Sequence, residues 1–134
     1  MANLVEIINK NLDLSKYETL IYKTDYQGHA KKLVRQAAEE DCDTVVAVGG
    51  DGTVNEVAGT AAQIGLTTGI IPTGSGNGLA RHLKIPIDPI KAIKIINTGI
   101  AKPIDGGKIN SIWFFCTCGV GFDATIGREF SKTK

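Results

Sequence analysis

Residues 48–57, VGGDGTVNEV, place three glycines, a carboxylate, a hydroxyl and an amide directly after an apolar run. Glycine has no Cβ, so the backbone N–H groups of such a turn can approach a ligand closely. A helix that starts at this turn adds free N–H groups and a positive end, which together bind phosphate oxygens. We therefore expect a phosphate-binding loop formed by Gly49, Gly50, Gly52, Thr53 and Asn55.

The carboxylate of Asp51 is the unexpected member of this loop, because it would repel a bare phosphate. A ligand-binding role for Asp51 therefore requires a metal ion, a sugar hydroxyl or a donor partner. Alternatively, Asp51 bonds its own backbone in an ordinary glycine turn, and this stretch alone does not decide between the two. The chain contains neither G-x-x-x-x-G-K-[ST] nor G-x-G-x-x-G, so the established phosphate-loop patterns give no help.

A second glycine cluster, PTGSGNGLARHL at residues 72–83, has the same kind of composition. Gly74 gives close backbone approach, Ser75 a hydroxyl and Asn77 an amide, while Arg81 offers a planar guanidinium to a phosphate. Ligands of open α/β sheets bind at the carboxyl ends of the strands, where both clusters are expected. Two such loops on neighbouring strands could hold one nucleotide between them.

Three segments have the pattern of strands. Residues 18–24, ETLIYKT, alternate between apolar and polar side chains. Residues 44–48, TVVAV, form the short β-branched run that is typical of a strand buried on both faces. Residues 67–72, TTGIIP, are the third candidate and end at a proline.

Helical patterns follow each of these strands. The segment 25–42 has apolar residues at helical spacing, and the segment 53–65 has Thr53 and Glu56 as a potential capping box. The segment 76–85 is a short helix, and a further helix runs to about Asn97 from an Asp88 cap. This order predicts an α/β fold with a mostly parallel sheet flanked by helices.

The sequence pattern changes from alternating strands and helices to extended segments near residue 100. AKPIDGGKI and SIWFFCTCGVGF have the pattern of extended segments joined by short turns, with no helix between them. We expect residues 1–100 to form the α/β domain and residues 101–134 to be the first strands of a truncated, β-rich second domain. About 34 residues are too few for an independent domain.

Composition narrows the class of protein. The 134 residues are 43% hydrophobic and 22% charged, as in ordinary globular domains, and the net charge of +1 gives no reason to expect nucleic acid as a partner. An odd set of three cysteines without C-x-x-C spacing indicates reduced thiols in a cytoplasmic protein. Strands left without partners could pair between two copies, which allows a homodimer.

GGDGTVNEV followed by PTGSGNGLAR resembles the catalytic domain of the diacylglycerol kinase family, which includes bacterial lipid kinases, sphingosine kinases and ceramide kinases. The resemblance implies the fold shared with NAD kinases and phosphoryl transfer from ATP, with Mg²⁺, to a lipid hydroxyl. The lipid would be met at a membrane surface, so the resemblance implies a cytoplasmic protein that associates peripherally with membranes.

The resemblance also assigns roles by position. Gly49 to Asn55 match the nucleotide-phosphate loop, Ser75 matches a hydroxyl that contacts ATP, and Thr24 matches a threonine near the nucleotide. Asp51 matches the carboxylate expected beside the phosphates and the metal, and is the candidate catalytic residue. Asp123, in GVGFDA, resembles a position near the lipid head group, although a helix-capping aspartate is the alternative.

The chain also departs from the family pattern. Many bacterial members have Asn-Asp in the second loop where this chain has Asn77-Gly78. Family members usually open with a strand and continue into a β-sandwich that carries the lipid pocket and the proposed base, so we expect a fragment that is inactive alone. The alternatives are an NAD kinase-like enzyme, which shares GGDGT, and a non-catalytic nucleotide-binding or dimerisation module.

Overall fold

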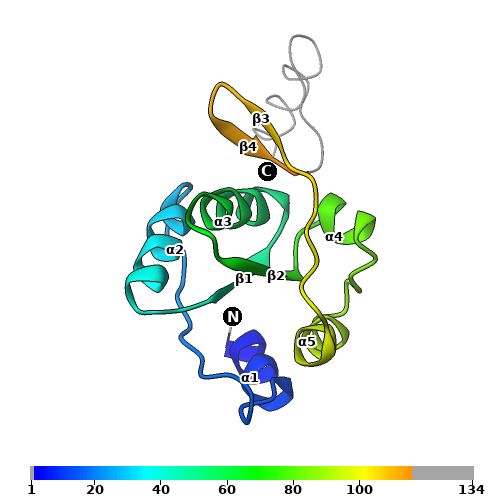
Figure 1. Cartoon of the computed structure of the whole chain (residues 1–134). Helices are drawn as coiled ribbons and strands as arrows, with labels where there is room; N and C mark the ends of the chain where they lie inside the picture. The colour runs from blue at the N-terminus through cyan, green and yellow to red at the C-terminus, as the bar shows by residue number, and fades with distance from the viewer. Residues whose placement is uncertain (1, 116–134) are drawn as a thin grey trace.

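The computed structural model describes residues 2–115 of the chain (Figure 1). Its elements in chain order are α1 (Ala2–Asn11), α2 (His29–Glu39), β1 (Thr44–Gly49), α3 (Asp51–Ile64), β2 (Thr67–Pro72), α4 (Gly78–His82), α5 (Pro89–Thr98), β3 (Gly107–Ile109) and β4 (Ile112–Phe114).

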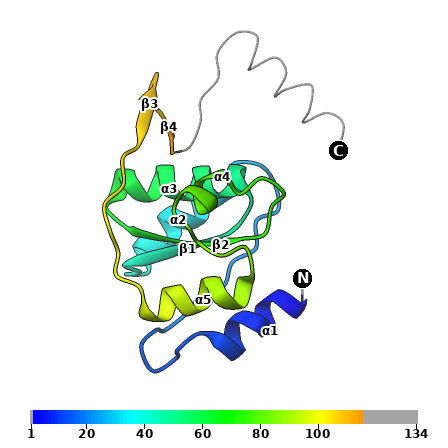
Figure 2. The same ribbon diagram turned by 90° about the vertical axis from the view of Figure 1, so that its right-hand side faces the viewer.

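The centre of the fold is a parallel pair of strands, β1 and β2, whose register runs from Thr44 opposite Thr67 to Gly49 opposite Pro72. Figure 2 shows helices on both sides of this pair: α2, α3 and α4 lie over one face, and α1 and α5 lie over the other. The predicted α/β class, with a parallel sheet between helices, is confirmed. The connection from β1 to β2 through α3 is the crossover that parallel neighbours require.

Each face of the sheet has its own apolar cluster. On the first face, α2, α3 and α4 meet β1 and β2 around side chains that include Val34, Ala47 and Ala61. On the second face, Ile71 of β2 packs with Ile93 of α5, and α1 covers them from outside. Ile93 is completely buried, so α5 is held mainly by this cluster.

The expected strand at residues 18–24 is wrong. The segment has no regular secondary structure, and Leu20 and Ile21 are 56% and 47% exposed. Alternating side chains make a strand only when a neighbouring strand accepts the backbone hydrogen bonds, and in residues 2–115 β1 pairs with β2 alone. A side-chain contact holds the segment instead: the Tyr22 hydroxyl donates to the Glu40 carboxylate at the end of α2.

The expected capping box is also wrong, because α3 begins at Asp51 and not at Thr53. Gly50 is the N-cap residue, which places Thr53 inside the first turn. The short helix after β2 covers only Gly78–His82, since Asn77 before it takes a left-handed conformation with φ of 53°. Asp88 caps α5 as predicted: its side chain accepts hydrogen bonds from the backbone of Ile90 and Lys91.

The chain leaves α5 at Gly99 and forms an antiparallel hairpin of β3 and β4. This confirms extended segments joined by a short turn in residues 107–114, and Asn110 and Ser111 at the turn both have positive φ. The domain boundary near residue 100 stays a prediction. Cys116, Cys118 and Asp123 lie outside the described residues.

Candidate functional site

The two glycine loops meet backbone to backbone where β1 and β2 end. The N–H of Thr73 donates to the Gly49 carbonyl at 3.0 Å, which continues the strand pairing into the loops. One residue further, a Cβ added to Gly74 would lie 2.4 Å from the Gly50 Cα. No side chain fits between the loops at this point, so glycine is required there for a physical reason.

Asp51 joins the two loops through its side chain. Its Oδ1 accepts a 2.7 Å hydrogen bond from the backbone N–H of Gly78, at the start of α4. Its Oδ2 lies so close to Gly76 that a Cβ there would be 2.7 Å away. The donor partner of this aspartate therefore comes from the second loop and not from its own turn, and a ligand-binding role for Asp51 stays a prediction.

The start of α3 supplies free backbone donors beside this junction. The first intrahelical hydrogen bond runs from the Val54 N–H to the Gly50 carbonyl. Within residues 2–115, the N–H groups of Asp51, Gly52 and Thr53 have no hydrogen-bond acceptor. Donors at a helix N-terminus favour an anion through both their hydrogen bonds and the helix dipole. This is the arrangement that binds phosphate oxygens.

Asn77 shapes the second loop from within and is 3% exposed. Its Oδ1 accepts from the Gly74 N–H at 3.0 Å, and its Nδ2 donates to the Gly74 carbonyl. Asparagine tolerates the left-handed backbone that this position requires. The side-chain amide is therefore used inside the loop, and it does not face the edge where a ligand would bind.

Ser75 and Arg81 remain on the outside of the second loop, and both residues are exposed. The Nε of Arg81 donates to the Gly76 carbonyl at 2.9 Å, which fixes the side chain along the loop. Its two terminal nitrogens form no hydrogen bond within residues 2–115. A guanidinium held in this way keeps donors available for a phosphate.

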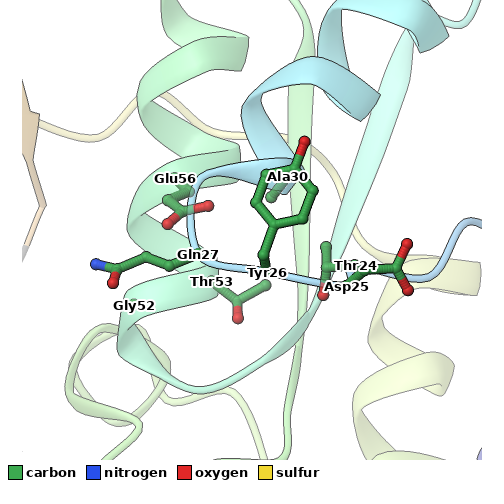
Figure 3. A pocket seen from close by; sticks show the side chains of 8 residues that line it. All are labelled: Thr24, Asp25, Tyr26, Gln27, Ala30, Gly52, Thr53 and Glu56. Carbon is green, nitrogen blue, oxygen red and sulfur yellow. The ribbon is translucent and has the colours of Figure 1, made fainter.

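A cleft of about 420 Å³ opens beside the start of α3 (Figure 3). It brings Thr24 and the residues after it together with Gly52 and Thr53, and a place for Thr24 near a nucleotide stays a prediction. Glu56 lines the same cleft, and its Oε1 accepts a 2.9 Å hydrogen bond from the Gly28 N–H. The complete lining is Thr24, Asp25, Tyr26, Gln27, Ala30, Gly52, Thr53 and Glu56.

A second cleft, of about 390 Å³, is lined in part by Asp51. Its wall combines the polar groups of Asp51 and Asn55 with the apolar side chains of Leu79 and Phe115. Asn55, which the sequence placed among the ligand-binding residues, lines this second cleft and not the first. Its Nδ2 donates to the Trp113 carbonyl at 3.1 Å.

A metal-binding cluster and a membrane-spanning helix are both absent from the described residues. Within residues 2–115, no three His, Cys, Asp or Glu side chains gather closely enough to hold a metal ion by themselves. The same residues include no helix that is both long and apolar enough to cross a membrane.

Most of the chain matches one known protein family. The model of the diacylglycerol kinase catalytic domain matches residues 1–109, which is most of the chain. The chain belongs to the diacylglycerol kinase catalytic domain family. This confirms the resemblance carried by the two glycine motifs.

Named relatives agree with this family. A diacylglycerol kinase of Bacillus subtilis (strain 168) is 37% identical over 122 residues, which are 89% of this chain and 40% of that protein. A diacylglycerol kinase of Staphylococcus carnosus (strain TM300) is 35% identical over 131 residues, 96% of this chain and 42% of that protein. The chain thus spans less than half the length of these two relatives.

A solved structure shares the fold of this family member. The crystal structure of a diacylglycerol kinase from Bacillus anthracis (strain Sterne) has a TM-score of 0.65 and 35% sequence identity. The match covers 70% of this chain and 33% of that one.

The structure brings most of the predicted site residues together at one edge of the sheet. Gly49 to Thr53, Gly74, Ser75 and Arg81 surround the loop junction, and Thr24 lies across the first cleft. Asn55 and Asn77 are near, but their amides serve other contacts. Asp123 is outside the described residues. Sequence reasoning missed the Glu56 tether, because it depends on a contact with a residue 28 positions away.

Proposed function

We propose that this diacylglycerol kinase family member is the nucleotide-binding part of an ATP-dependent lipid kinase. The enzyme would transfer the γ-phosphate of ATP to a lipid hydroxyl, such as that of diacylglycerol or a sphingoid base. The observation that carries the proposal is the set of N–H groups on Asp51, Gly52 and Thr53 that have no acceptor within residues 2–115, beside the Gly50–Gly74 contact. The names of the relatives support the reaction class.

In this proposal the phosphates of ATP lie over the start of α3, between the two loops. Ser75 and the free end of Arg81 donate to the phosphates from the second loop. Thr24 and Thr53 contact the nucleoside in the first cleft, whose polar lining offers hydroxyl and carboxylate acceptors to a ribose or a base. Phosphoryl transfer depends mainly on positioning and on charge stabilisation, which fixed donors of this kind supply.

The residues present fit a Mg²⁺ ion that is held chiefly by the nucleotide. Magnesium bound to ATP uses one or two protein carboxylates and keeps phosphate and water ligands, so no dedicated cage is required. Asp51 is the carboxylate that would contact it, through Oδ2, because Oδ1 is bonded to Gly78. When bound, the ion neutralises charge that develops on the transferred phosphate.

The lipid side of the proposed reaction requires a base and a site for the head group. We place the base that accepts the proton of the lipid hydroxyl outside residues 2–115, and Asp123 near the head group. A lipid acceptor implies that the protein works at a membrane surface from the cytoplasm. Pairing of two copies into a homodimer remains a proposal as well.

Transfer of labelled phosphate tests the reaction class. The full-length kinase that contains these residues is incubated with ATP labelled in the γ-phosphate, Mg²⁺ and, separately, diacylglycerol, sphingosine or NAD. Label on either lipid is the expected result. Label on NAD alone would overturn the lipid-kinase assignment, and ATP binding without transfer to any acceptor would favour a nucleotide-binding module.

Two substitutions at Asp51 test its place in the site. Asp51→Ala should lower the affinity for ATP with Mg²⁺ about tenfold or more, because a hydrogen bond to a charged group contributes about 1.5–3 kcal/mol. Asp51→Asn keeps an oxygen acceptor for the Gly78 N–H, so it should retain more of the affinity than Asp51→Ala. Calorimetric titration measures both, and unchanged affinity in Asp51→Ala would contradict the role.

A further inference from the structure

The β3–β4 hairpin rests on α3 through Trp113. The Trp113 carbonyl accepts the 3.1 Å hydrogen bond from the Asn55 side chain. One helical turn further, a Cβ added to Gly59 would lie 3.2 Å from the Trp113 Cβ, so the strand lies directly on the helix there. Among residues 2–115, no other hydrogen bond joins the hairpin to the α/β part.

Trp113 in turn supports the apolar wall of the second cleft. Its ring stacks on the ring of Phe115, with centroids 5.9 Å apart and planes within 6°. Gly106 packs against both rings, since a Cβ there would be 2.9 Å from Phe115 and 3.1 Å from Trp113. Phe115 then reaches both the core of the first face and the cleft beside Asp51.

Asn55 lies between the N-terminal end of α3 and the aromatic pair of Trp113 and Phe115. It lies one turn after Asp51 on α3, and its side chain lines the same cleft as Phe115. The Asn55 Nδ2 donates to the half-buried Trp113 carbonyl. Without this donor the carbonyl would be left unpaired, which costs free energy. The amide thus connects the helix that carries the phosphate-binding N–H groups to the strand that carries the aromatic wall.

We propose that Asn55 is a positioning residue that holds the β3–β4 hairpin on α3 and so sets the Phe115 wall beside Asp51. This role is different from the phosphate or ribose contact that the sequence indicated for Asn55. Its importance for the acceptor side of the reaction rests on the proposed function. The structural role itself does not, because it concerns contacts present without any ligand.

Trp113 is the single tryptophan of the chain, so its fluorescence reports this contact directly. Asn55→Ala removes the donor, and Asn55→Asp replaces it with an oxygen of similar shape that repels the Trp113 carbonyl. In both variants the constant for acrylamide quenching of Trp113 should rise about twofold or more, because a hairpin without its tether opens locally.

Two further variants make the measurement specific. Gly59→Ala adds the Cβ beneath Trp113 without touching Asn55, and it should raise quenching to a smaller extent. Alanine favours a helix over glycine, so this variant remains informative if an Asn55 substitution unfolds the protein. Asn97→Asp is the matched control: it removes the amide that donates to the Asn11 carbonyl and keeps an oxygen for the Asp13 N–H, and this contact joins α5 to α1 on the opposite face of the sheet (Figure 2).

The expected result is increased quenching in the Asn55 and Gly59 variants, with Asn97→Asp at the level of the unchanged protein. Wild-type quenching in Asn55→Ala and Asn55→Asp would overturn the proposal, and so would an equal increase in Asn97→Asp. The measurement needs neither nucleotide nor lipid. A failure here is therefore distinguishable from a failure of the kinase assignment, which appears in the transfer assay.

Discussion

At the scale of single residues, the loop junction depends on glycines that pack directly against atoms of the other loop. Gly50 and Gly74 touch each other, and Gly76 lies against the Asp51 carboxylate. Gly52, in the same motif, has open space around the position of a Cβ. Steric contact therefore requires glycine at position 50 but not at position 52 of the same motif.

Replacing Gly74 by alanine tests this difference. The new Cβ would lie 2.4 Å from the Gly50 Cα, so the two loops must separate. We expect a loss of about 1–3 kcal/mol in the free energy of unfolding, as for overpacked sites. Gly52→Ala is the control, and in the first turn of α3 it should leave the stability equal or slightly higher. Urea denaturation measures both; equal stability of the two variants would contradict the explanation.

Residue types predicted the place of the two loops better than they predicted the contacts of each side chain. Glycine clusters at the ends of two neighbouring strands were enough to predict that the two loops lie side by side, and phosphate as their ligand stays a prediction. The sequence could not show that Asn77 turns inward, because its partner is the backbone of its own loop. It also could not show that Asn55 bonds Trp113, which is 58 positions away.

At the scale of elements, α3 connects every part of the candidate site. Its first turn carries the N–H groups that have no acceptor in the described part of the chain, Asn55 bonds the hairpin, and Glu56 bonds the segment that leads into α2. Gly28, which Glu56 contacts, is the N-cap of α2 and has no side chain to cap the helix. A carboxylate from α3 thus does part of the capping work for another helix.

Substitutions at Glu56 test this tether. Glu56→Ala leaves the Gly28 N–H without its acceptor, and we expect a loss of about 1–3 kcal/mol in the free energy of unfolding. Glu56→Gln keeps a carbonyl oxygen for the same bond and should retain most of the stability. Hydrogen exchange at the Gly28 amide gives the local measurement. If the alanine and glutamine variants exchange equally fast there, the carboxylate does not hold this amide.

Sequence patterns predicted elements well where the chain itself supplies their partners. The runs 44–48 and 67–72 became β1 and β2 because each is the other's neighbour, and Asp88 caps α5 through local bonds. The pattern at 18–24 failed because strand formation needs an adjacent strand, and periodicity contains no information about that. Tyr22 also lowers the pKa of Glu40 by donating to its carboxylate, a contact that no local pattern predicts.

At the scale of the whole molecule, two apolar clusters on opposite faces hold the sheet between its helices. The second cluster is small, with Ile71, Ala92 and Ile93 fully buried in it. Because α1 packs mainly against α5, this cluster also determines whether the N-terminal helix stays attached. Stability on that face therefore depends on few side chains.

Two isoleucines of α5 give a matched test. Ile93 is completely buried and Ile95 is 42% exposed, while both changes to alanine affect helix propensity equally. Ile93→Ala should cost about 2–5 kcal/mol of unfolding free energy, and Ile95→Ala clearly less. Urea denaturation compares them, with Ile93→Val as the milder variant if Ile93→Ala does not fold. Equal losses would mean that α5 is not held by burial of this face.

The contact between Gly50 and Gly74 has a consequence for how such sequences can change over time. Each residue occupies the space that a side chain on the other would need. A substitution at either position is therefore not an independent event, since it requires a compensating backbone shift in the other loop. In an alignment of homologues, positions 50 and 74 should accordingly vary together or not at all, whereas this contact places no constraint on position 52.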